Sequence, residues 1–209
     1  DIATGTGHNA LSFAPHVHQV VGLDLTAPML AEACHLASTR AITNVRFFQG
    51  DSEHLPFRNG SFDVVTCRVA PHHFPDVASA IREMARVCRP GGCVAIVDNV
   101  TPEDQEACAY INAWEILRDP SHHWAYPLSE WHQFFAQAGL TLTSEDVVPK
   151  AMQFESWATR MGVGEAVVTE IRRQLFDAPP LPRARLRPRF EGDEAYFDLT
   201  EALFIARKA

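Results

Sequence analysis

The sequence predicts an α/β fold, a doubly wound and mostly parallel seven-stranded sheet with an antiparallel last strand and helical cap insertions. From Gly7 to Asp98, short apolar runs alternate with helical patterns, as in a parallel sheet covered by helices. Two glycines, Gly5 and Gly7, come shortly before an apolar run that ends in Asp24. The 209 residues are 46% hydrophobic and 21% charged, which is typical of a globular chain with one core.

The predicted strands are short runs rich in apolar and β-branched residues, as strands buried on both faces usually are. A first strand is expected to precede Asp1, so the N-terminus is expected to be truncated. The second to fifth strands are predicted at 20–24, 45–49, 62–67 and 93–97, a sixth at 140–148 and the last at 202–206.

The predicted helices carry apolar residues at helical spacing. Pro28 in the first turn favours a helix over 27–41, and the sequence Arg89-Pro90-Gly91-Gly92 ends another that begins near Val77. Further helices are predicted at 107–117, 131–138, 154–161 and 168–175, and a surface loop at 178–190. We therefore predict one domain over 1–209, with 99–138 and 150–190 as cap segments.

Charge and cysteine content narrow the class of partner. A net charge of −8 disfavours nucleic acid, whose binding depends on clustered Lys and Arg, and favours a small-molecule substrate. No apolar run approaches the roughly 20 residues of a membrane span, and no signal peptide is visible. The five cysteines form no C-x-x-C pair, which is typical of reduced thiols in the cytoplasm. Oligomeric state is not predicted.

The opening motif predicts a nucleoside site. Glycine turns let a ligand approach the backbone, and an acid at the end of the next strand can accept hydrogen bonds from ribose hydroxyls. Gly5-x-Gly7-x-x-Ala10 with Asp24 also satisfies the permissive dinucleotide fingerprint, so these residues alone leave the nucleoside open.

Three further segments narrow the choice of nucleoside cofactor. They are Phe47 to Phe57, which contains Asp51 and Ser52, then Gly60 to Val65, and Arg89 to Gly92. Together with the opening glycines and Asp24, these residues resemble a class I S-adenosylmethionine-dependent methyltransferase with a Rossmann-like fold, of the branch that includes the quinone-biosynthesis methyltransferases. The resemblance is close over 1–98 and looser over 129–209.

The resemblance implies a set of cofactor-binding residues. Asp24 would hold both ribose hydroxyls, Leu25 and Met29 would form the apolar wall against the adenine, and Asp51 would accept from the adenine amine beside Ser52. Arg68 would line the methionine side. The loop beneath the methionine end would comprise Asp1, Ala3, Gly5 and Gly7. The family usually has glycine where Ala3 stands, and we expect Ala3 to need only ordinary backbone angles. The alternative is that Asp24 and Asp51 only cap the turns after their strands.

The candidate catalytic residues are His72 and His73, which follow the predicted fourth strand. A neutral imidazole suits the removal of a proton from a hydroxyl or an acidic carbon, although methyl transfer can proceed without a base. The alternative is that these histidines, and the second pair His122 and His123, only cap helices or line a wall. No H-E-x-x-H spacing occurs, so no metal site is predicted.

The cap segments hold the candidate acceptor residues. Trp131 and Phe135 lie at helical spacing and are assigned to packing, whereas Trp124 and Tyr126 follow Pro120 in an aperiodic loop and are predicted to face the pocket. The arginines at 183, 185, 187 and 189 are either an anion contact or a solvated face.

The function predicted is methyl transfer from S-adenosylmethionine to a small organic acceptor at oxygen, carbon or nitrogen. One alternative is an NAD-dependent short-chain reductase, but no tyrosine is followed four residues later by the lysine that such an enzyme needs. The other is a non-catalytic S-adenosylmethionine-binding module.

Overall fold

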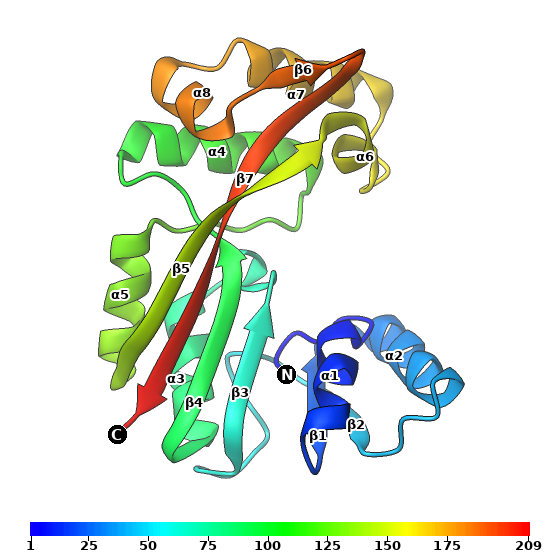
Figure 1. The fold of residues 1–209 in the computed structure, drawn as a ribbon, viewed down its shortest axis with the longest axis vertical. Helices are drawn as coiled ribbons and strands as arrows, with labels where there is room; N and C mark the ends of the chain where they lie inside the picture. The colour runs from blue at the N-terminus through cyan, green and yellow to red at the C-terminus, as the bar shows by residue number, and fades with distance from the viewer.

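The computed structural model describes all of residues 1–209, which form a mixed sheet with helices around it (Figure 1). One part of the sheet pairs β1 with β2, and the other has the order β3-β4-β7-β5, with β6 paired to β7. The strands are β1 Val20–Asp24, β2 Val45–Gln49, β3 Phe62–Arg68, β4 Cys88–Asn99, β5 Leu140–Gln153, β6 Arg189–Glu191 and β7 Glu194–Lys208.

Strand directions divide the sheet into a parallel and an antiparallel part. β1 pairs with β2 in parallel, and β3 with β4 likewise. β7 runs antiparallel to β4 and to β5, so the predicted antiparallel last strand is confirmed. Ile2 lies between the two parts and forms parallel bridges to Leu23 and to Cys67.

The glycine loop is defined here as residues 3–7. The helices that follow this loop and the first strands lie close to the predicted ranges. Pro28 occupies the first turn of α2, as predicted. Asp76 begins α3 by accepting a hydrogen bond from the backbone N–H of Ser79. α3 ends at Val87, just before Arg89 to Gly92, which form the first part of β4. The helices are α1 His8–Phe13, α2 Ala27–Thr39, α3 Val77–Val87, α4 Gln105–Arg118, α5 Leu128–Gln137, α6 Phe154–Thr159, α7 Glu165–Phe176 and α8 Pro180–Leu186, with short 3-10 turns at Ala14–His16 and Pro71–His73.

The larger hydrophobic core lies between α3, α5 and one face of β3, β4 and β7. Ile96 and Phe204 are opposite each other in the β4–β7 ladder and are fully buried on this face. Trp131 and Phe135 of α5 pack on Phe204, with ring centroids 5.0 and 5.4 Å away. The assignment of Trp131 and Phe135 to packing is confirmed.

The opposite face of this part of the sheet carries no helix (Figure 1). Val64 is 48% exposed, and Leu203 and Ile205 are only partly buried. The prediction of helices on both faces is therefore not met here, because α1 and α2 pack against β1 and β2 instead. Beside Asp1, a groove of about 340 Å³ runs between β1 and β3, where the strand before Asp1 is predicted; that strand stays a prediction.

A second hydrophobic core lies in the cap, formed by α4, α6, α7, α8 and the first half of β7 (Figure 1). Trp114 stacks on Trp157 with ring centroids 4.6 Å apart, and Phe197 meets both rings edge-on. The expectation of a single core is wrong, because the long strands β5 and β7 extend beyond the body and carry apolar residues for the cap helices to cover.

Two element predictions need correction in the cap. Residues 178–190 are not a loop: α8 begins after Pro179, and its Leu186 is buried in the cap core. The sixth strand continues past 148 to Gln153, because β7 stays paired with it as far as Tyr196. α5, inside the predicted cap segment 99–138, packs in the body against α3 and β5.

Candidate functional site

The predicted site residues gather at one edge of the sheet, where β1, β2, β3 and β4 all end. Gly50 donates from its backbone N–H to the carbonyl of Asp24, which brings the end of β2 beside the end of β1. Val69 likewise donates to Val97, which joins the end of β3 to β4. Parallel strands place their carboxyl ends at a common edge, the usual position of ligands in such sheets.

The glycine loop has a left-handed backbone at its turns. Gly5 and Gly7 have φ values of 54° and 81°, which glycine adopts without steric cost. A Cβ added at Gly7 would lie 2.9 Å from the Cβ of Ala33, so the close approach of α2 requires glycine. Ala3 also has a positive φ, of 52°. The expectation of ordinary angles for Ala3 is therefore wrong, because the loop turns at each of these alternate positions.

Asp24 links the first strand to the glycine loop. One carboxylate oxygen accepts from the backbone N–H of Gly5 at 2.7 Å, and the other from that of Thr26 at 2.9 Å. The side chain is mostly buried and has no cationic partner within ion-pair distance. An ionised carboxylate has about four acceptor positions, so two remain for hydroxyl donors.

Asp1 is held by three donors from three different segments. Its carboxylate accepts from the hydroxyl of Thr4 at 2.6 Å, the amide of Asn9 at 2.6 Å and the hydroxyl of Thr66 at 2.7 Å. Asp1 thus fixes the loop to α1 and β3. In this structure its role is to hold the loop in shape.

A cavity of about 220 Å³ opens above the loop and contains three of the predicted residues besides Gly5: Asp1, Ala3 and Arg68. Arg68 is exposed and makes no hydrogen bond or ion pair, so its guanidinium is available to an anion. Val69, also in the wall, has a φ of 51°, which is strained for a β-branched residue. Nothing in the local sequence predicts this strained backbone at Val69.

The residues predicted for the adenine lie outside that cavity, on an open surface. Leu25 is 69% exposed and Met29 is 46% exposed, an apolar surface that a flat base could cover. Asp51 is exposed and accepts from the backbone N–H of Glu53 at 2.9 Å, with His54 Nδ1 3.2 Å away. The Glu53 hydrogen bond, then that of His54, lowers the pKa of Asp51. Ser52 lies in the turn between Asp51 and His54. The turn-capping alternative therefore describes the contacts that Asp51 makes in this structure.

These residues fit S-adenosylmethionine by their chemistry. The Asp24 carboxylate retains acceptor capacity, Leu25 and Met29 offer an apolar face, and Arg68 offers a free cation. The loop carries no lysine after Gly7, consistent with a ligand that has no phosphate. Gly7 lies at the turn of the loop but does not line the cavity.

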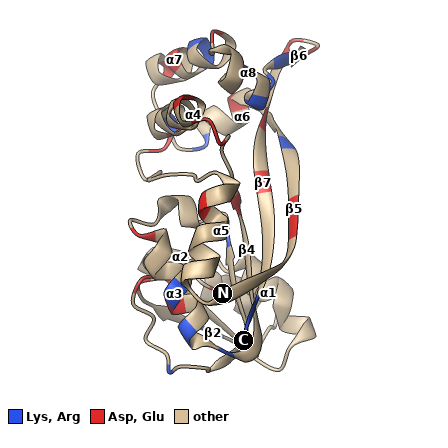
Figure 2. Cartoon of the chain, turned by 90° about the vertical axis from the view of Figure 1, so that its left-hand side faces the viewer, with Lys and Arg blue, Asp and Glu red and all other residues tan.

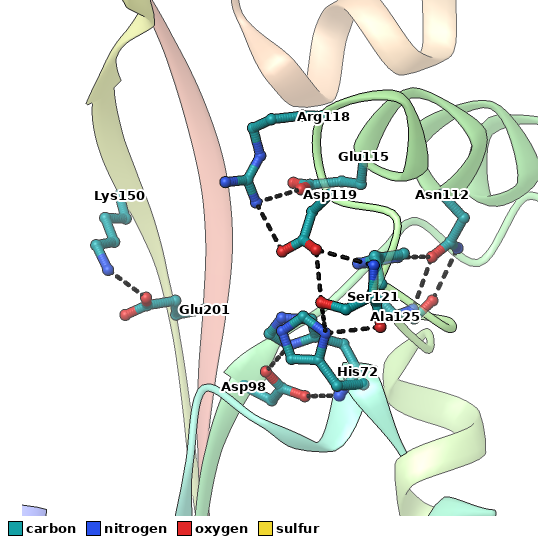
Figure 3. Close-up of polar contacts among 12 residues, drawn as sticks. His72, Asp98, Asn112, Glu115, Arg118, Asp119, Ser121, Ala125, Lys150 and Glu201 are labelled. Carbon is teal, nitrogen blue, oxygen red and sulfur yellow. Dashed lines mark hydrogen bonds and ion pairs between the residues drawn. The ribbon is translucent and has the colours of Figure 1, made fainter. Parts of the chain in front are cut away.

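Of the two candidate catalytic histidines, His72 is the more deeply held (Figure 3). Its Nδ1 lies 2.6 Å from one oxygen of Asp98, and its backbone N–H donates to the other at 2.8 Å. Both residues are buried, Asp98 completely. Burial alone would lower the pKa of His72, but the Asp98 carboxylate outweighs it, and the pKa of His72 is raised. Asp98 was not singled out from the sequence, although it directly follows the strand predicted at 93–97.

His73 and His122 stand beside His72 but differ in their partners. His73 Nδ1 donates to the backbone carbonyl of Ser121 at 2.9 Å, and burial and then the charge of His72 lower its pKa. His122 Nε2 donates to the amide oxygen of Asn112 at 2.8 Å, and burial followed by the neighbouring histidines lowers its pKa to about 3. His122 is thus a neutral structural residue at ordinary pH.

The loop after α4 attaches the cap to the His72 segment. The backbone N–H groups of His123 and Trp124 both donate to the carbonyl of His72, at 2.8 and 2.9 Å. Above His72, Arg118 pairs with the buried Glu115 at 3.3 Å and lies 3.8 Å from Asp119 (Figure 3). Trp124 and Tyr126 of this loop are half-buried, and neither lines the cavity above the glycine loop. Their acceptor role stays a prediction.

The remaining sequence candidates have structural partners. Asp198, which is buried, pairs with Arg187 at 3.2 Å and Arg189 at 2.8 Å, so these two arginines are not free for an anion.

The five cysteines form no disulfide, and the protein contains no cluster of three or more metal-ligating side chains. None of the helices has the length and hydrophobicity required to span a bilayer.

Comparison with known proteins agrees with this fold. A methyltransferase-domain family model matches residues 1–96. YcgJ of Bacillus subtilis, named a methyltransferase, is 42% identical over 162 residues, which cover 78% of this chain and 64% of YcgJ. YafE of Escherichia coli is 34% identical over 79% of this chain and 80% of its own length. A demethylmenaquinone methyltransferase of Thermus thermophilus is 41% identical over 105 residues, 49% of this chain and 47% of that enzyme.

The fold itself is shared over the whole chain. The crystal structure of YcgJ superposes with a TM-score of 0.95 at 36% identity, covering 100% of this chain and 90% of that one. The mixed sheet and its superposition on YcgJ define the class as an α/β methyltransferase fold. The chain belongs to the methyltransferase family. The sequence match covers 64% of the length of YcgJ and 47% of that of the demethylmenaquinone methyltransferase.

Proposed function

We propose that this protein transfers a methyl group from S-adenosylmethionine to a small organic acceptor. The observation that carries the proposal is the Asp24 carboxylate, which holds the glycine loop at Gly5 and keeps acceptor capacity free at the end of β1. Membership of the methyltransferase family supports the choice of cofactor.

The bound cofactor would supply a methyl group on a sulfonium, which is already a good leaving group. Asp24 would accept hydrogen bonds from the ribose, Leu25 and Met29 would cover the adenine, and Asp51 with Ser52 would receive its amine. At the methionine end, the loop with Asp1, Ala3, Gly5 and Gly7 would supply backbone contacts and Arg68 the charge for the carboxylate. The protein's main contribution would be orientation and the exclusion of water.

The acceptor is proposed to enter between the sheet edge and the cap, with His72 or His73 as the base. The net charge of −8 supports a small molecule over nucleic acid, and in Figure 2 the Lys and Arg positions lie interspersed with Asp and Glu positions along the chain. We further propose a single domain over 1–209, whose cap comprises the part of 99–138 that precedes α5 together with 150–190. The free thiols support a cytoplasmic location.

Thermal denaturation with two ligands tests the proposal. S-adenosylhomocysteine should raise the melting temperature, because a ligand that binds only the folded state stabilises it by about 2.7 kcal/mol at 100 times its Kd. NADH at the same concentration should leave the melting temperature unchanged. Stabilisation by NADH alone would favour the reductase instead.

A second measurement separates an enzyme from a binding module. Acceptor candidates are incubated with the protein and methyl-labelled S-adenosylmethionine, and label transfer is followed. Tight binding of the cofactor without transfer to any phenol, carbon acid or amine would favour the non-catalytic module.

A further inference from the structure

We propose that Asp98 selects His72, rather than His73, as the proton acceptor of the site, and that the acceptor substrate is therefore protic, a hydroxyl or an acidic carbon. Asp98 is in this view a positioning residue that acts through the imidazole. The substrate class rests on the proposed methyl transfer, whereas the state of His72 can be measured without it.

The carboxylate of Asp98 holds His72 at two points. One oxygen lies 2.6 Å from the ring Nδ1, and the other accepts the backbone N–H of the same residue at 2.8 Å. Because both the main chain and the ring are fixed by one rigid strand residue, the imidazole cannot rotate freely. No Lys or Arg lies within ion-pair distance of Asp98, so His72 is its only partner for charge.

The partner at Nδ1 decides the tautomer of His72. A carboxylate accepts only, so Nδ1 carries the proton, and in the neutral ring the lone pair is on Nε2. Nε2 makes no hydrogen bond to any protein group, although 93% of the side chain is shielded from solvent. The basic nitrogen of the ring thus has no protein partner, although His72 does not line the cavity above the glycine loop.

His73 lacks this support. Its Nδ1 donates to the backbone carbonyl of Ser121, and the carboxylate of Asp119 reaches it only through the Ser121 hydroxyl, which donates to Asp119 at 2.5 Å. A neutral carbonyl stabilises an imidazolium far less than a carboxylate does. His73 is therefore the weaker proton acceptor of the two.

The groups that face His72 come from every neighbouring element. Burial opposes its charge, whereas the acids favour it, so its pKa is raised. The rings of the other two histidines are 4.1 and 5.4 Å away, and their pKa values are lowered, so they stay neutral beside it. The titratable groups are Asp98 on β4, His73 in the 3-10 turn, Glu115 and Asp119 on and after α4, and His122 in the following loop.

The proton step balances within these residues. The acceptor O–H or C–H bond breaks, its proton forms an N–H bond with the Nε2 lone pair, and the electron pair stays on the acceptor atom as the nucleophile. The positive charge gained by the ring is matched by the Asp98 carboxylate at Nδ1. An acceptor without such a proton, for example a thioether, would not need this pair.

Long-range ¹H–¹⁵N spectra of the histidine side chains over a pH series test the proposal. The His72 signal is identified by its absence in His72→Gln. In the wild type, Nδ1 should be protonated and Nε2 bare in the neutral ring. In Asp98→Asn, the proton affinity of His72 should fall at least tenfold. Asp119→Asn, the matched change to a carboxylate near His73, should alter His72 much less.

Reaction with diethyl pyrocarbonate distinguishes a reactive imidazole from a merely structural one. His72 should be acylated at Nε2 by the folded wild type, with a pH midpoint that follows the titration and falls in Asp98→Asn. A wild-type His72 with its proton on Nε2, an unreactive His72, or an unchanged titration in Asp98→Asn would each overturn the proposal. The wild-type spectrum and reactivity decide even if Asp98→Asn fails to fold. Neither readout needs the cofactor, so failure of S-adenosylhomocysteine to bind counts against the proposed function alone.

Discussion

Replacing Asp24 by alanine is expected to raise the Kd for S-adenosylhomocysteine at least 100-fold. The carboxylate anchors Gly5 and Thr26 and would accept from the ribose hydroxyls. Hydrogen bonds to a charged group contribute about 1.5–3 kcal/mol each, and a 100-fold change in Kd corresponds to about 2.7 kcal/mol. Titration calorimetry of both proteins measures the difference.

Two further variants control this experiment. Asp24→Asn keeps an oxygen for the Gly5 N–H but loses charge and one acceptor, so an intermediate loss is expected. Asp63→Ala removes an exposed carboxylate that pairs with Arg89 at the start of β3, the end of that strand away from Arg68, and should leave the Kd unchanged. An Asp24→Ala protein that is folded and binds within threefold of the wild type would contradict the assignment.

Trp114→Ala is expected to lower the free energy of unfolding by about 3–5 kcal/mol, the usual cost of truncating a buried tryptophan. Trp114 is fully buried, stacks on Trp157, and donates from Nε1 to the carbonyl of Ile171 at 2.9 Å. Urea denaturation measures the loss.

Binding of S-adenosylhomocysteine should survive this change, since the cap core shares no residue with the glycine loop or with Asp24. Trp124→Ala, in the half-buried loop, should cost about 1 kcal/mol or less. If folded Trp114→Ala lost the ligand while Trp124→Ala kept it, the cap and the cofactor site would be coupled in a way that this structure does not explain.

The body of the fold could be predicted because its signals are local. Apolar runs at 20–24, 45–49, 62–67 and 93–97 and the proline in the first turn of α2 each depend on neighbouring residues only. The cap could not be predicted as well. α8 contains two prolines, Pro180 and Pro182, and two arginines, Arg183 and Arg185, a composition typical of a loop. It becomes a helix because Leu186 packs into the cap core.

The features of the site likewise fall into those that the local sequence predicts and those that it does not. Gly5, Gly7 and Asp24 form a pattern whose spacing alone indicates a turn followed by an acid. The partnership of His72 with Asp98 joins residues 26 apart through the β3–β4 register and leaves no local trace. The left-handed backbone at Ala3 and Val69 is equally invisible, because neither residue type favours it.

A crystal structure of the protein with S-adenosylhomocysteine tests the central claim most directly. The account predicts the ribose hydroxyls on the Asp24 carboxylate, with the adenine against Leu25 and its amine at Asp51. A ligand bound elsewhere, or bound here with Asp24 turned away from the sugar, would contradict it.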